Sequence, residues 1–91
     1  MSERCIRCVV SGRVQGVFFR AETQRKALEF GLTGWVKNLP DRTVELVACG
    51  TQELLEPFIA WLHEGPPRAS VTRVSVDDHP LQDYTEFKVI R

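Results

Sequence analysis

Apolar and polar residues alternate in several short stretches of the 91-residue chain, and this alternation predicts β-strands. In the first stretch, Ile6, Cys8 and Val10 fall on one face of a strand. Pro40 and Asp41 separate the second and third stretches, and both residue types form turns, so these two strands should make a hairpin. The predicted strands cover residues 4–11, 33–38, 43–48, 71–76 and 84–90.

Helical spacing of apolar residues predicts two helices between the strands. The first covers Ala21–Phe30, and Gly31 supplies its C-terminal stop. The second begins after Thr51, a typical N-cap residue, and ends at residues 65–67 (GPP). Pro57 removes one helical hydrogen bond, which predicts an irregular first turn or a later start. The apolar stripe of this helix is formed by Leu54, Leu55, Phe58, Ile59 and Leu62.

The predicted order β-α-β-β-α-β indicates an α+β fold of the ferredoxin-like type. In this sandwich, two helices cover one face of a four-stranded antiparallel sheet. Ninety-one residues are too few for two cores that fold independently, so we expect a single domain over residues 1–91.

The balance of charges limits the classes of partner. Twelve Lys and Arg residues face twelve Asp and Glu residues, so the chain lacks the basic field of most nucleic-acid-binding proteins. No apolar run reaches the roughly 18 residues of a membrane span, and residues 1–4 lead into the first strand without the apolar core of a signal peptide. We therefore expect a cytoplasmic protein that binds neither nucleic acid nor membrane.

The three cysteines do not predict a metal site. Cys5 and Cys8 have CxxC spacing, but no second pair of ligands completes a zinc site. Residues three apart on a strand also point to opposite faces of the sheet.

The segment with the clearest chemical signal is residues 12–20 (GRVQGVFFR), which joins the first strand to the first helix. Its two glycines permit a main chain that turns successive N–H groups inward, and the helix that follows adds its positive end. Arg20 could close over the same anion with its planar fork. The alternative is a simple turn above core side chains, namely Val14, Val17, Phe18 and Phe19.

Several segments together resemble the acylphosphatase family. The matches follow the family in order and spacing, and they extend over nearly the whole chain. They comprise residues 12–20, Thr23, residues 32–38 (LTGWVKN), Val44–Glu45, Gly50, Trp61–Leu62, residues 65–67 and residues 87–90 (FKVI).

The resemblance implies a metal-independent and cofactor-independent hydrolysis of the carboxyl–phosphate bond of acyl phosphates. The oligomeric state is open, and nothing in the sequence demands more than a monomer. It implies that Arg20 binds the phosphate and that Asn38 orients the attacking water. Inorganic phosphate would be the product or an inhibitor. The backbone cradle would be formed by Gln15, Gly16, Val17, Phe18, Phe19 and Arg20. The chemistry agrees with these residue types, because the leaving carboxylate is stable and needs no general acid.

Two features remain open at this point. Family members often carry a glycine in the hairpin after the asparagine, whereas this chain has residues 40–43 (PDRT), so the turn type is uncertain. Cys5 opens the first strand and Cys49 closes the third, and these strands are antiparallel neighbours in the expected fold. The two cysteines could therefore form a disulfide, or they could be two reduced thiols as is usual in the cytoplasm.

Two other functions fit the same order of elements. An RNA-recognition module shares it, but the chain lacks the aromatic RNP motif and a net positive charge. A regulatory module that binds phosphate or carbamoyl phosphate within a larger enzyme also shares it. The short chain, with both Arg20 and Asn38 present, favours the hydrolase.

Overall fold

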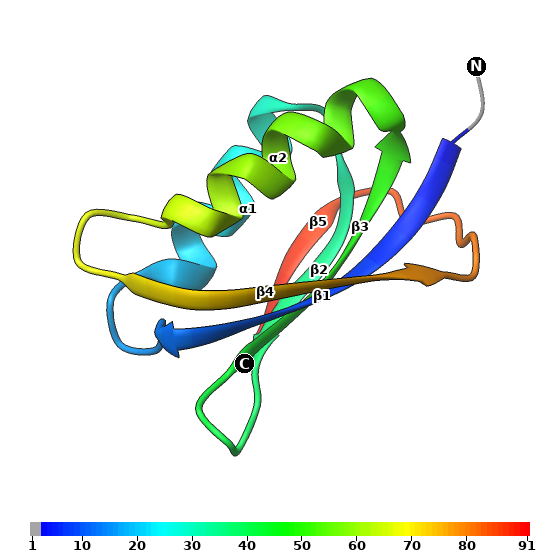
Figure 1. The fold of residues 1–91 in the computed structure, drawn as a ribbon. Helices are drawn as coiled ribbons and strands as arrows, with labels where there is room; N and C mark the ends of the chain where they lie inside the picture. The colour runs from blue at the N-terminus through cyan, green and yellow to red at the C-terminus, as the bar shows by residue number, and fades with distance from the viewer. Residues whose placement is uncertain (1–2) are drawn as a thin grey trace.

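Two helices cover one face of a five-stranded sheet in the computed structural model, which describes residues 3–91 (Figure 1). The expected direct passage from Met1 and Ser2 into the first strand lies outside the described residues. The elements are β1 (Glu3–Arg13), α1 (Phe19–Glu29), β2 (Thr33–Asn38), β3 (Val44–Thr51), α2 (Gln52–Glu64), β4 (Ser70–His79) and β5 (Phe87–Ile90).

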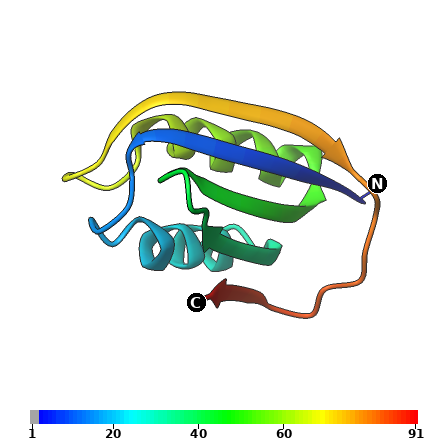
Figure 2. The ribbon, with the colours of Figure 1, turned by 90° about the horizontal axis from the view of Figure 1, so that it is seen from below.

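The sheet confirms the ferredoxin-like α+β class, with one correction to the number of strands. Its order is β4-β1-β3-β2-β5, and the first four strands pair antiparallel as expected. The prediction of a purely antiparallel four-stranded sheet is wrong, because β5 adds a fifth strand parallel to β2. The alternation had marked both residues 71–76 and 84–90 as strands, but the β-α-β-β-α-β order has a place for only one of them. Residues 80–86 carry the chain from one edge of the sheet to the other (Figure 2).

The observed starts of the two helices can be compared with their predicted starts. Helix α1 begins at Phe19 instead of Ala21, and Gly31 follows its end with a φ of +71°. Helix α2 begins directly after Thr51, without an irregular first turn or a late start. Pro57 is accommodated because it is exposed, as is Glu53, whose carbonyl loses its helical donor and can be solvated instead.

The core lies between the helices and the sheet. Ile6, Cys8 and Val10 of β1 face it, as their alternation predicts, and Phe58 of α2 meets Phe87 of β5 edge to face at 6.4 Å. Burial raises the pKa of the Cys8 thiol to about 12, so Cys8 stays protonated and unreactive in the folded protein.

A bulge at Gly12 directs the end of β1 into the loop that follows. The pairing of β1 with β4 shifts register between Ser11 and Gly12, and Gly12 has a φ of +118°. A Cβ atom at this position would lie 2.2 Å from the carbonyl oxygen of Ser70, which no side chain can tolerate. Glycine therefore lets the two main chains approach where the loop begins.

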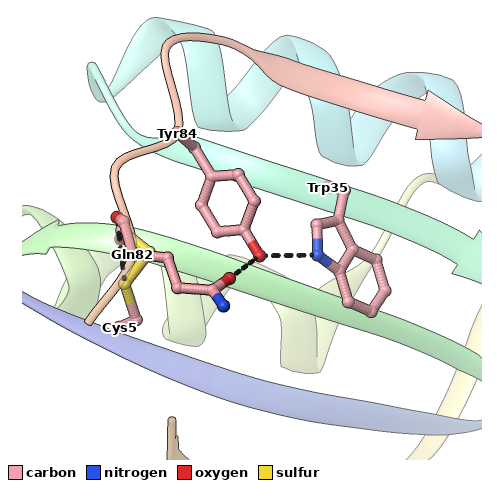
Figure 3. The surroundings of a disulfide bond; sticks show 5 residues. Cys5, Trp35, Gln82 and Tyr84 are labelled. Carbon is pink, nitrogen blue, oxygen red and sulfur yellow. Dashed lines mark hydrogen bonds between the residues drawn. A yellow bond between two sulfur atoms is a disulfide. The ribbon is translucent and has the colours of Figure 1, made fainter. Parts of the chain in front are cut away.

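The sheet face opposite the helices carries a disulfide between Cys5 and Cys49 (Figure 3). The two residues are direct partners in the antiparallel β1–β3 pair, with their Cα atoms 4.1 Å apart. Trp35 and Tyr84 pack against this cluster, and the indole Nε1 of Trp35 donates to the Tyr84 hydroxyl at 3.1 Å. The hydroxyl of Tyr84 in turn donates to Gln82. These contacts fasten the residue 80–86 connection to the open face of the sheet.

We expect the disulfide to be present in the purified protein and to stabilise it. Denaturation without reductant should expose one free thiol, that of Cys8, whereas denaturation after reduction should expose all three cysteines. Reduction, or the replacement Cys49→Ser, should lower the free energy of unfolding by about 2–4 kcal/mol, because the unfolded chain regains the freedom of the closed loop. Thiol titration and urea unfolding measure these quantities. Three free thiols without reductant would contradict the bridge.

Candidate active site

Arg20 and Asn38 line the same cleft, although 18 positions separate them in the sequence. The cleft has a volume of about 710 Å³ and lies where the loop after β1, the first turn of α1, the end of β2 and strand β5 meet. Gly16, Phe18 and Phe19 of the expected cradle also line it. The side chain of Gln15 reaches away to the hairpin, Val17 is buried, and Cys5 and Cys49 lie on the other face of the sheet.

The loop between β1 and α1 has the main-chain conformation of an anion-binding nest. Gly16 has a φ of +73° and Phe18 a φ of +62°, so two left-handed residues flank Val17. Left-handed residues within such a turn direct neighbouring N–H groups toward a common point. The core fixes the loop from below, because Val14, Val17 and Phe19 are buried. The core-packing interpretation is confirmed for these three residues and is wrong for Phe18, which is exposed, whereas anion binding by the loop stays a prediction.

The N–H groups of this loop are available to a ligand. The first main-chain bond of α1 runs from the Glu22 N–H to the Phe18 carbonyl at 3.0 Å. Within residues 3–91, the N–H groups of residues 16–20 donate to no protein acceptor. They also lie at the positive end of α1, which favours a negatively charged ligand.

Arg20 is the second residue of α1 and is held against the C-terminal strand. Its Nη1 donates to the main-chain carbonyl of Ile90 at 3.2 Å. This bond uses one of the five N–H donors of the guanidinium and leaves the rest of the fork for an anion. No carboxylate of the described chain forms an ion pair with Arg20, so its charge is not neutralised within the protein.

Asn38 is the last residue of β2, and its side chain holds a buried oxygen atom without a partner. Asn38 pairs with Val44 of β3, which fixes its main chain at the edge of the cleft. Among the described residues, its Oδ1 is buried and accepts no hydrogen bond. Such an oxygen carries a free-energy cost unless a donor reaches it, and a rotation of the Asn38 side chain is needed for water in the cleft to be that donor.

Gln15 connects the loop to the hairpin that follows Asn38. Its side-chain Nε2 donates to the carbonyls of Leu39 and Thr43, both at 2.9 Å. These are the two residues that close the turn, since the Leu39 N–H donates to the Thr43 carbonyl at 2.9 Å. For Gln15, the sequence predicts only that its main chain belongs to the phosphate cradle. Its side-chain role depends on two carbonyl groups that the sequence does not place.

The unusual turn at residues 40–43 leaves Asn38 in the cleft. Arg42, in the hairpin after the asparagine, adopts the left-handed conformation with a φ of +74°. Asp41 accepts bonds from the Thr43 N–H at 3.0 Å and from its hydroxyl at 2.6 Å, and these bonds hold the pKa of Asp41 below its usual value. The turn is therefore stabilised by its own side chains, and the substitution of its residues does not displace Asn38.

Strand β5 and the chain end form a wall of the cleft that the sequence analysis missed. Lys88, Val89 and Arg91 line it, together with Glu86, whose carboxylate lies 3.7 Å from Lys88 Nζ. With Arg20, three cationic side chains thus face one carboxylate. The missing signal was topological, because only the parallel pairing with β2 brings residues 86–91 beside α1.

The described chain has neither a cluster of metal-binding side chains nor a membrane-spanning helix. Residues 3–91 contain no cluster of three or more His, Cys, Asp or Glu side chains arranged to bind a metal ion. No helix in this range has the length and apolar character to span a membrane.

Comparison with known proteins relates the chain to acylphosphatases. The family model for acylphosphatase matches residues 6–89. The acylphosphatase of Coxiella burnetii strain Dugway 5J108-111 is 50% identical over 88 residues, which cover 97% of this chain and 93% of that protein. A solved acylphosphatase structure from Coxiella burnetii superposes with a TM-score of 0.94 at 50% identity, covering 97% of this chain and 93% of that one.

Two other solved structures show the range of the similarity. The acylphosphatase from Bacillus subtilis has a TM-score of 0.93 and 36% identity, with 99% of this chain and 100% of that chain covered. HypF from T. kodakarensis has a TM-score of 0.85 and 36% identity, but the match covers 97% of this chain and only 12% of that one.

We expect Gln15 to stabilise the arrangement of the loop and the hairpin. Gln15→Leu removes both side-chain bonds to the hairpin, which should lower the free energy of unfolding by about 1–3 kcal/mol and shift the amide resonances of residues 39–43. Gln52→Leu is the matched control. Gln52 is exposed and bonds only to exposed side chains, so this change should stay within about 0.5 kcal/mol. Urea unfolding and NMR spectra compare the two variants, and equal effects would contradict the bridging role.

Proposed function

The chain belongs to the acylphosphatase family, and on that premise we propose how its cleft performs the reaction. The enzyme hydrolyses the carboxyl–phosphate bond of acyl phosphates to a carboxylate and inorganic phosphate. In our proposal, Arg20 and the main-chain N–H groups of residues 15–20 bind the phosphoryl group. Asn38 orients the attacking water.

The observation that carries the proposal is the pairing of unsatisfied donors and an unsatisfied acceptor in one cleft. Within the part of the chain that the structure describes, the N–H groups of residues 16–20 and most of the Arg20 fork have no protein acceptor, and the buried Oδ1 of Asn38 has no protein donor. A phosphoryl group needs donors for its oxygens, and a water molecule that attacks phosphorus needs an acceptor for one of its hydrogens. The bound substrate and water would thus satisfy these groups once the Asn38 side chain turns its oxygen toward the cleft.

The chemical step needs positioning and charge stabilisation more than proton transfer. The water oxygen attacks phosphorus in line with the departing acyl oxygen, the P–O bond to the acyl group breaks, and its electron pair leaves on the carboxylate. Both protons of the water remain with the product as H2PO4⁻, and one of them then exchanges with solvent, so the step balances as RCO–OPO3²⁻ + H2O giving RCOO⁻ + H2PO4⁻. Negative charge on the equatorial oxygens is stabilised by fixed dipoles and by the guanidinium, which do not reorganise during the reaction.

Glu86 carries the one side-chain carboxylate among the described residues that line the cleft, and we propose that it is not a general base. It is exposed and lies beside Lys88 at the rim, 3.7 Å from its Nζ, while the unpartnered acceptor is the buried Asn38 oxygen. A carboxylate leaving group is already stable as an anion, so the step requires neither acid nor base from the protein.

We further propose that the protein acts as a monomeric single domain over residues 1–91, without metal or cofactor. Inorganic phosphate would bind the same cradle as product and inhibitor. The neutral formal charge supports the absence of a nucleic-acid partner. The regulatory-module hypothesis has less support, because the Coxiella burnetii protein matches the chain over nearly its full length whereas HypF does so over a small part.

We expect Arg20→Ala and Asn38→Ala each to lower kcat/KM for benzoyl phosphate by roughly 100- to 1,000-fold, measured with EDTA present.

Arg20→Lys keeps the charge but loses the fork, so the inhibition constant of inorganic phosphate should rise well above that of the parent. Asn38→Ala should leave the midpoint of thermal unfolding unchanged or raise it, because it removes a buried oxygen that has no partner.

Glu86→Gln is the matched control in the same cleft, and its kcat/KM should stay within about threefold of the parent, as expected for an exposed rim residue. Activity that survives both alanine substitutions would refute the assignment of Arg20 and Asn38. Inactivity of Glu86→Gln would reveal a general base, and loss of parent activity in EDTA alone would reveal a metal.

A further inference from the structure

We propose that the ring of Phe18 is the binding platform for the acyl group, so that the enzyme prefers acyl phosphates with an aromatic or large apolar acyl group to acetyl phosphate. This inference rests on the proposed function, because it assumes that the phosphoryl group lies against the loop amides and Arg20. It adds a specificity-determining side chain at the opposite end of the substrate.

The side chain of Phe18 buries little apolar surface when the protein folds. It is 75% exposed, more than any other large apolar side chain of the described residues. Its neighbours Val14, Val17 and Phe19 are buried, so the loop is already fixed to the core without it. A ring left this far in water contributes little to the stability of the folded protein.

The main-chain conformation at Phe18 favours glycine, so the presence of an aromatic side chain there calls for a functional explanation. Its φ of +62° is in the left-handed region, where a side chain is disfavoured and glycine is not. The nest requires this conformation, because it directs the N–H groups inward. The loop therefore carries a phenylalanine despite its backbone conformation, and the side chain is mostly left in solvent by the described residues, so their packing offsets little of the strain. A contact with a ligand would offset it.

The position of Phe18 matches the place where the acyl group must lie. Phe18 lines the same cleft as Arg20 and Asn38 and is two positions from Arg20 along the chain. In an in-line displacement the acyl oxygen leaves opposite the attacking water. The acyl group thus leaves on the side of phosphorus opposite the water that Asn38 orients. Phe18 is an exposed ring among the residues that line the cleft, and it offers a flat apolar face to this group.

The test compares benzoyl phosphate with acetyl phosphate, which share the phosphoryl group and differ in the acyl group. The quantity measured is the ratio of their kcat/KM values, corrected for spontaneous hydrolysis. Phe18→Ala and Phe18→Gly should lower this ratio by roughly two- to tenfold, the range expected for one lost aromatic contact. Phe18→Tyr keeps the ring face and should keep the ratio within twofold of the parent.

Leu28→Ala is the matched control, since Leu28 is also an exposed apolar residue of α1 (57%) but does not line the cleft. It should leave the ratio and both rates unchanged. Phe18→Gly should fold at least as well as the parent, because glycine accepts a φ of +62° without strain. The comparison therefore does not depend on one variant that fails to fold.

An unchanged ratio in Phe18→Ala and Phe18→Gly would overturn the platform, whatever happens to the two rates together. A lower ratio in Phe18→Tyr equal to that in Phe18→Ala would overturn it as well. Failure of the proposed function has a different signature, namely Arg20→Ala and Asn38→Ala variants that hydrolyse both substrates like the parent.

Discussion

The structure depends on a left-handed turn that the main chain makes between β1 and α1. Gly16 and Phe18 both have positive φ values, and buried side chains at Val14, Val17 and Phe19 hold the turn against the core. Among the described residues, no protein acceptor reaches the N–H groups of this turn at the start of the helix. These three facts together support our proposal that the turn binds an anion, since donors, helix end and rigidity meet at one place.

The rest of the fold brings the other groups of the cleft to this turn. Gln15 ties the turn to the hairpin after β2, which places Asn38 at its edge. Strand β5 closes the far side, where the Ile90 carbonyl accepts a bond from Arg20 and the Phe87 carbonyl accepts one from Gln24 at 2.8 Å. On the other face of the sheet, the disulfide cluster fastens the connection that leads to β5 (Figure 3). Segments from both the N-terminal and the C-terminal parts of the chain thus hold the residues of the cleft in place.

Local patterns predict the local features of the structure. The alternation in β1 correctly places Ile6, Cys8 and Val10 on the core face, and the glycines of residues 12–20 predict the tight turn that the loop makes, while anion binding there stays a prediction. Features that depend on contacts between distant segments cannot be predicted in this way. The parallel pairing of β5, the reach of the Gln15 side chain to two carbonyls and the exposure of Phe18 all result from topology. Pro57 was misjudged because solvent access to the Glu53 carbonyl cannot be read from helical spacing.

Phosphate binding by the loop can be measured by NMR titration of the ¹⁵N-labelled protein with inorganic phosphate. We expect the amide resonances of residues 16–20 to shift most and to saturate together, because their N–H groups donate to the phosphate oxygens. The Asn38 side-chain amide should respond at the same concentrations, because it lines the same cleft. If the resonances of residues 16–20 stay unchanged while those of other amides shift, phosphate binding by this loop is contradicted.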